Sequence, residues 1–280
     1  MRTYSLLLLT LIGLAFLGCG DNASGEDQQT FTPIIEGRKV YISGFYQDST
    51  LDQMVACYWL DGIRVDLEYG AAEDITVQNG DVYVAGQWFD ATGWNGEACY
   101  WINGIRYDLQ GGENPDVEVT GIAVDNGDVY VSGVRSDGSM FGTNACYWKN
   151  GNVNTVSRNS SFGNSWGATA FGIFLDGNDV YLAGYNAIAN KFDIGCKWKN
   201  GNLHELSGST ANEQQTWLYD IAVANGVKIT VGFYYTFIED ENDPLYYDSP
   251  IFAIYYRNGQ RVNLEESEWQ VGEATGVFIE

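Results

Sequence analysis

The 280-residue sequence is poor in proline and in basic residues, and it lacks a helical pattern. It has 4 prolines against 34 glycines, and no window keeps apolar residues at i, i+3, i+4 and i+7. These absences argue against long helices and favour a turn-rich β protein. With 14 Lys and Arg against 37 Asp and Glu, the net charge is −23, which disfavours nucleic acid as a partner. A surface this acidic is typical of a soluble secreted protein, and it favours cations or basic partners.

The apolar run near the N-terminus is too short to cross a bilayer. Arg2 precedes the run Leu6–Leu17, whereas a spanning helix needs roughly 20 residues. The run is typical of an export signal. It ends in Ala15-Phe16-Leu17-Gly18-Cys19, which resembles the cleavage site of bacterial lipoproteins, although Phe16 departs from the usual Leu.

This resemblance implies that residues 1–18 are a signal peptide and that the thiol of Cys19 carries a lipid. The protein is then anchored in the cell envelope, at the outer membrane or the cell surface, and the membrane is its first partner. Ordinary secretion with cleavage nearby is the alternative. Residues 19–30 are polar and acidic and predict a flexible tether.

Residues 31–280 contain one unit repeated five times. The first motif is Ala-Cys-Tyr-Trp followed by one residue and then Asn-Gly or Asp-Gly. Its copies end at Gly62, Gly104 and Gly151, and degenerate copies end at Gly201 and Gly259. A second motif of the type Val-Tyr-Val-Ala-Gly precedes each copy and ends at Gly44, Gly86, Gly133, Gly184 and, loosely, Gly232.

Each unit is predicted to contain four strands joined alternately by tight turns and long loops. Asn-Gly between β-branched runs is a strong hairpin signal. The tryptophans Trp59, Trp101, Trp148 and Trp198 are 42, 47 and 50 residues apart, which is the period of propeller blades. We therefore predict an all-β fold, a five-bladed β-propeller of four-stranded antiparallel blades.

The ends of the chain predict that this ring is closed. Residues Gly276–Ile279 match the first strand of the other units, whereas the first repeat begins with a second strand at Val40. Pairing of Val277–Ile279 with Val40–Ser43 would complete a blade and remove both sheet edges. The alternative partner is Phe31–Ile35, in which Pro33 lacks the N–H of a ladder hydrogen bond.

The repeat resembles propeller-type repeats of surface lipoproteins from Bacteroidetes-type bacteria. It is more distantly similar to the extracellular HAF repeat, in which a Trp-x-x-Gly turn leads into an Asp-Leu strand, here at Trp59–Leu67 and Trp101–Leu109. The resemblance implies an exported, surface-facing β-repeat protein, and it implies no catalytic residue.

Aromatic residues in or beside the long loops are the candidate ligand-binding residues. Rigid aromatic side chains with polar edges suit sugar rings and protein hot spots, but they also cap the ends of blades as core. The candidates are Trp88, Trp94, Trp166, Tyr185, Trp217, Tyr219 and Trp269. We therefore predict a lipid-anchored binding or scaffold protein for a glycan or a protein.

Other chemistry is weaker in the sequence. The four repeat cysteines Cys57, Cys99, Cys146 and Cys196 lack the spacing of a zinc site and are predicted to be small buried side chains. The single histidine, His204, is predicted to be a solvated strand residue. No metal, cofactor or catalytic residue is predicted.

Two acidic features leave alternatives open. Asp74 and Asp220 are expected near the central axis, so paired carboxylates of a glycan-active enzyme are the alternative function. The run Glu239–Asp243 contains oxygen ligands for Ca²⁺ but not the spacing of a calcium loop. A solvated acidic loop is the simpler interpretation of that run.

Overall fold

The computed structural model describes most of the repeat region, and the described residues belong to one compact unit, Pro33–Glu280. They are residues 39–48, 53–90, 96–112, 117–136, 142–156, 165–188, 193–206, 214–236, 251–264 and 275–277. The predicted signal peptide, Cys19, the tether, Trp94, Trp269 and the run Glu239–Asp243 lie outside the described residues.

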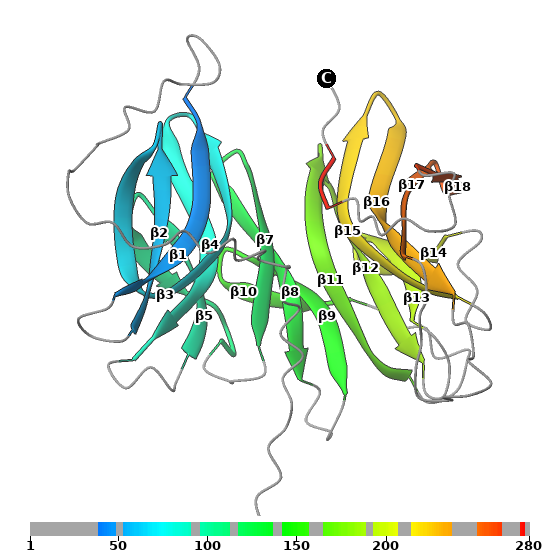
Figure 1. The fold of residues 1–280 in the computed structure, drawn as a ribbon, viewed down its shortest axis with the longest axis horizontal. Helices are drawn as coiled ribbons and strands as arrows, with labels where there is room; N and C mark the ends of the chain where they lie inside the picture. Colours follow the sequence, from blue (N-terminus) through cyan, green and yellow to red (C-terminus); the bar gives the residue numbers. More distant parts are fainter. Residues whose placement is uncertain are drawn as a thin grey trace, which may run out of the picture. The chain divides into compact units, whose positions relative to one another are not determined.

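All the regular secondary structure in the described residues is β-strand, which confirms the all-β prediction (Figure 1). The strands are β1 Tyr41–Asp48, β2 Gln53–Leu60, β3 Ile63–Gln78, β4 Asp81–Phe89, β5 Gly96–Ile102, β6 Ile105–Asp108, β7 Glu118–Asp125, β8 Asp128–Ser136, β9 Thr143–Lys149, β10 Asn152–Thr155, β11 Ser165–Asp176, β12 Asp179–Ile188, β13 Ile194–Lys199, β14 Asn202–Glu205, β15 Gln214–Ala224, β16 Val227–Thr236, β17 Ile251–Arg257 and β18 Gln260–Asn263. No helix in this part of the chain is long and apolar enough to span a membrane.

Strand pairing follows the sequence repeat, although the sheets contain 6, 8 and 4 strands. Strands β7 to β10, β11 to β14 and β15 to β18 each pair consecutively and antiparallel. A single parallel bridge between Gly167 and Thr143 joins the first two of these sets into the larger sheet. The repeats are therefore units of strand pairing, which we number 1 to 5 along the chain.

Strand β3 belongs to two units, where the sequence had predicted a long loop. Residues Ile63–Tyr69 pair with β2 of unit 1, and Gly70–Gln78 pair with β4 of unit 2. Gly70 has a φ of 149°, and a Cβ there would overlap the backbone of Gln87, so glycine allows the strand to pass from one unit to the next. Unit 1 has three strands in the described residues, and unit 2 has four.

The Asn-Gly turns form as predicted, and their asparagines also bind a neighbouring strand. Asn103 and Gly104 have φ values of 49° and 82°, the positive values that a type I′ turn requires. The Oδ1 atom of Asn103 accepts a hydrogen bond of 2.9 Å from the N–H of Val82. Asn150, Asn200 and Asn258 accept the same bond in the other units from Val129, Val180 and Lys228.

The glycine that ends the second motif is required by a bulge in the first strand of the unit. The extra residues in these bulges are Glu73, Thr120, Phe171 and Tyr219. A Cβ on Gly86, Gly133, Gly184 or Gly232 would overlap the backbone oxygen that lies two residues before the bulge. Only glycine lets the two backbones approach this closely, and a bulge redirects the side chain of the extra residue.

The motif aromatics and cysteines form the centres of the unit cores. Trp101, Trp148 and Trp198 are fully buried, and Tyr256 takes their place in unit 5. The cysteines Cys57, Cys99, Cys146 and Cys196 are buried and form no disulfide, which confirms their predicted structural role. Burial raises the pKa of the Cys146 thiol to about 12.

The predicted pairing of the chain ends is not part of the described structure. Strand β1 pairs with β2 alone among the described residues. Val277 lies outside any strand, and the described residues include neither Phe278–Glu280 nor Phe31–Ile35. The five-bladed closed ring therefore stays a prediction.

Candidate functional site

Three of the seven predicted binding residues lie together where units 4 and 5 meet. They are Tyr185 on β12 and Trp217 and Tyr219 on β15, and Phe171 on β11 and Phe233 on β16 join them. We call these five residues the aromatic cluster. Phe233 is buried and the other four are half-buried.

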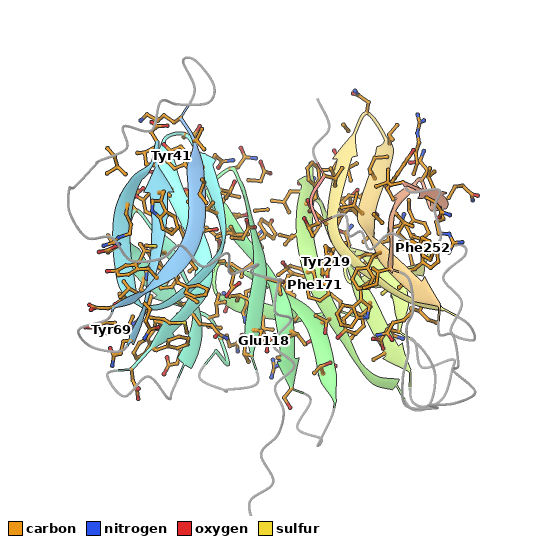
Figure 2. All side chains as sticks on the ribbon, viewed as in Figure 1. Tyr41, Tyr69, Glu118, Phe171, Tyr219 and Phe252 are labelled. Carbon is orange, nitrogen blue, oxygen red and sulfur yellow. The ribbon has the colours of Figure 1, made fainter. Side chains whose placement is uncertain are left out.

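The cluster is built around a parallel stack of two rings. The ring centroids of Tyr185 and Trp217 are 5.0 Å apart, with 13° between the planes. Phe171 and Tyr219 lie edge to face at 5.3 Å, side by side in Figure 2. Phe233 lies 5.7 Å from both Trp217 and Tyr219. These spacings are typical of favourable aromatic pairs, so the cluster is a rigid surface.

Backbone geometry explains why two of these rings meet. Phe171 and Tyr219 are the bulge residues of units 4 and 5, so their side chains leave the regular alternation of the strand. Tyr185 directly follows the motif glycine Gly184 on β12, and Phe233 follows Gly232 on β16. The bulge positions of units 2 and 3 carry Glu73 and Thr120 instead of an aromatic residue, so this cluster is specific to units 4 and 5.

Asp193 fixes the orientation of the indole in the stack. Its Oδ2 atom accepts hydrogen bonds from Nε1 of Trp217 at 2.9 Å and from Nε2 of Gln215 at 2.6 Å. Burial raises the pKa of Asp193, and these two bonds partly offset the effect. A charge-assisted bond donated by the indole N–H to a carboxylate holds the indole plane more firmly than a bond to a neutral acceptor would.

The electrostatic environment of the cluster is negative. Burial raises the pKa of the Tyr185 hydroxyl, and the charges of Asp193 and Glu118 raise it further, whereas a hydrogen bond with Thr169 lowers it. Burial and the charge of Glu118 also raise the pKa of Glu73. Among the described residues, no basic side chain contributes to these shifts. The described charges that act on the cluster are therefore negative.

Each of the two predicted axial carboxylates binds the backbone of a segment far away in the sequence. Asp74 accepts hydrogen bonds from the N–H of Ile75 at 2.8 Å and of Ile122 at 2.8 Å. Asp220 accepts from Ile221 at 2.7 Å and from Val277 at 2.9 Å. Each carboxylate thus uses both oxygens to link its own strand to another segment.

Burial raises the pKa of Asp74 to about 6, the two backbone bonds lower it, and the charge of Asp220 raises it slightly. Burial also raises the pKa of Asp220. Asp220 is one of the groups whose charge acts on Asp74, whereas a glycosidase depends on the separation of its two carboxyl groups. Because backbone N–H groups occupy both carboxylates, their first role is structural.

The remaining candidate residues lie elsewhere or cannot be placed. Trp88 is half-buried in unit 2, with the guanidinium of Arg106 4.1 Å from the centroid of its ring. The backbone of Trp166 lies in β11, but its side chain is outside the described part of the structure. His204 is an exposed residue of β14, as predicted. No group of three or more possible metal ligands occurs in the described residues.

Phe171, Phe233 and Asp193 were not among the residues predicted from the sequence. Two of them had a signal in the sequence. Phe171 has the position of Tyr219 in unit 5, and Phe233 follows the motif glycine as Tyr185 does in unit 4. Asp193 had none, because its contact with Trp217 joins two units whose packing the sequence does not display.

Comparison with known proteins does not assign a family. No family model and no curated protein matches the chain. An alpha-L-arabinofuranosidase from Clostridium thermocellum matches with 12% identity and a TM-score of 0.34, over 82% of this chain and 90% of that one. An acylaminoacyl peptidase from Pyrococcus horikoshii matches with 15% identity and a TM-score of 0.37, over 75% of this chain and 32% of the peptidase.

A GH32 beta-fructofuranosidase from Bombyx mori matches with 11% identity and a TM-score of 0.37, over 77% of this chain and 57% of the enzyme. The chain thus spans about a third of the peptidase and under two thirds of the fructofuranosidase. These similarities are too low to assign an activity, and the function rests on the site itself.

Proposed function

We propose that the protein is a lipid-anchored cell-envelope protein that binds glycans through the aromatic cluster. The observation that carries this proposal is the stack of Tyr185 and Trp217, in which Asp193 holds the indole in place. Sugar rings present C–H faces that pack on aromatic rings, and their hydroxyls donate to carboxylate oxygens. A cluster that combines both groups suits a glycan better than an apolar ligand.

The charge of the site restricts the class of glycan. Asp193 and Glu118 act on Tyr185, and no described basic group takes part. With a net charge of −23 on the whole chain, uronic acids and sulfated sugars are repelled before contact. The ligand class is therefore neutral or amino-bearing oligosaccharides.

The frame that carries this site is a closed five-bladed β-propeller, each blade being one of the sequence repeats. Equivalent contacts between successive units support it. Ser132 Oγ donates to the backbone oxygen of Phe171 at 2.9 Å, and Ser43 Oγ donates to that of Glu73 at 3.4 Å. Cys19 and the tether of residues 19–30 would hold this frame at the outer membrane or cell surface.

Isothermal titration of the full lipoprotein in detergent with neutral, amino-bearing and uronic oligosaccharides tests the proposal. We expect Trp217→Ala to weaken binding about tenfold or more, because removing a central aromatic contact removes about 1.4 kcal/mol or more. Asp193→Asn should weaken it less, since the amide oxygen still accepts from the indole. Tyr107→Ala is the matched control, because Tyr107 is 43% exposed and stacks on Tyr100 far from this cluster in sequence. Tight binding that survives Trp217→Ala would overturn the proposal.

A second candidate function is hydrolysis of the bound glycan by Asp74 and Asp220. The raised pKa of Asp74, about 6, suits a general acid. Release of reducing sugar from any oligosaccharide that binds, lost in Asp74→Asn, would support an enzyme. Unchanged oligosaccharide after prolonged incubation would limit the protein to binding.

A further inference from the structure

Strand β1 exposes apolar side chains that the equivalent strands bury. Ile42 is 52% exposed, whereas Val84, Val131 and Leu182, at the same motif position, are each 1% exposed. Phe45, which follows the motif glycine, is also 52% exposed, whereas Phe233 at that position is 5% exposed. Ile42 and Phe45 are three residues apart and point to opposite faces of β1, so both faces of this strand lack the covering that the other units have.

Among the described residues, Gly44 lacks the contact that makes glycine necessary elsewhere. In units 2 to 5 a Cβ at the motif glycine would overlap a backbone oxygen of the bulged first strand. At Gly44 a Cβ would meet the ring of Trp59, at 3.0 Å, and no backbone oxygen of the described part of the chain. Unit 1 thus has the glycine, Gly44, that accommodates a bulged first strand in the other units. No such strand is among the described neighbours of β1.

The segment Thr275–Val277 lies where that missing strand would begin. The N–H of Val277 donates to Oδ2 of Asp220 at 2.9 Å, as the N–H of Ile122 donates to Oδ2 of Asp74 at 2.8 Å. Ile122 belongs to β7, the first strand of the unit after Asp74. Val277 therefore has the position of a first strand in the unit after Asp220.

We propose that the edge of β1 opposite β2 is the docking surface for the C-terminal residues 274–279, with Ala274 opposite Gly44, Gly276 opposite Ser43 and Val277 opposite Ile42. The register follows from the other units. Gly121 pairs with Ser132 and Ile122 with Val131 in unit 3, and these residues correspond to Gly276, Ser43, Val277 and Ile42. The inference rests on the proposed five-bladed frame and specifies how it closes.

The sequence of the segment fits this register. Thr275 takes the position of the bulge residue, as Thr120 does in unit 3. Ala274 stands opposite the motif glycine, where units 2 and 4 also have alanine, Ala72 and Ala170. Val277 and Ile279 would lie on the same face as Ile42, and Phe278 would supply an apolar side chain to the other face. Asp220 places the segment beside unit 5 before it pairs with β1.

Cysteine cross-linking of the full chain tests the register. Residues opposite each other in an antiparallel pair have Cα atoms about 4.5–5.5 Å apart, within the range of a disulfide. Ile42→Cys with Val277→Cys should form a disulfide within one chain under mild oxidation, identified by peptide mass spectrometry. Tyr46→Cys with Val277→Cys is the matched control, because four residues along β1 move the thiol by about 13 Å.

Equal cross-linking in both pairs, or links that join two copies of the chain, would overturn the proposal. A second comparison does not depend on cysteine. Gly44→Ala should lower Tm about as much as Gly86→Ala does, because both would meet a bulged strand. A Tm loss in Gly86→Ala alone would overturn the docking. Glycan titration of the same variants separates the proposals, since retained binding with failed cross-linking overturns only the closure.

Discussion

Replacing Asp74 with Asn should change how the stability of the protein depends on pH. The pKa of this carboxyl is raised from 3.8 to about 6 by burial. A raised pKa in the folded state means that the fold prefers the protonated acid. Stability from this group is therefore fully present below pH 3.8 and is lost as the pH rises to about 6. About two pH units at about 1.4 kcal/mol each give a loss of about 3 kcal/mol.

The difference between parent and variant isolates this loss from every other titrating group. Asn is always neutral, but its amide nitrogen cannot accept the second of the two backbone N–H bonds, so Asp74→Asn should have a lower free energy of unfolding than the parent near pH 4. Between pH 4 and pH 7.5 the free energy of unfolding of the variant should rise by about 3 kcal/mol relative to that of the parent. Urea unfolding of both proteins at a series of pH values, followed by the fluorescence of the buried tryptophans, measures these free energies of unfolding.

The control is Asp128→Asn. Asp128 is half-buried, and hydrogen bonds from Lys149 and Asn150 lower its pKa. Its stabilising effect is present above the unfolded pKa and is lost as pH falls, so its difference curve should have the opposite sign. A flat difference between the parent and Asp74→Asn from pH 4 to 7.5 would refute the burial argument.

Other predictions test the anchor, the thiols, the core and the C-terminal segment. Cys19→Ser should release the protein from membranes, and a variant that still resists salt washing of the membrane fraction would contradict the lipid anchor. The four repeat cysteines should resist a thiol reagent in the folded protein and all react after unfolding without reductant; fewer reacting thiols would reveal disulfides. Trp101→Ala should lower the free energy of unfolding by about 3–5 kcal/mol, measured in urea, and a loss under 1 kcal/mol would contradict its role in the core. Deleting residues 276–280 should lower Tm by far more than loss of a frayed end would, and an unchanged Tm would contradict the docking of this segment.

The structural features that depend on local sequence could be predicted from the sequence repeat. The Asn-Gly turns, such as Asn103-Gly104, form because their φ values are a property of the residues themselves. The buried tryptophans and cysteines were also predictable, because the same pattern recurs with the same spacing. The continuous strand β3 was not, because a loop and a strand that bends at Gly70 look alike in sequence.

The candidate site was predicted only in part, for a related reason. Tyr185, Trp217 and Tyr219 were selected because aromatic residues gather near strand ends, but nothing local separated them from Trp88, which lies in another unit. Their association depends on bulges and on the contact of Asp193 with Trp217. These are properties of the junction between two units, so a single repeat does not encode them.

The bond from each axial aspartate to the following unit also makes the repeats non-interchangeable. At this one position the units carry Asp74, Gly121, Gly172 and Asp220, and a Cβ on Gly172 would overlap the backbone of Asp220. A chain assembled from identical copies of unit 5 would therefore force an aspartate into the space that Gly172 leaves for its neighbour. Gly172 is thus needed beside Asp220, and the order of the repeats at this junction is a part of the fold.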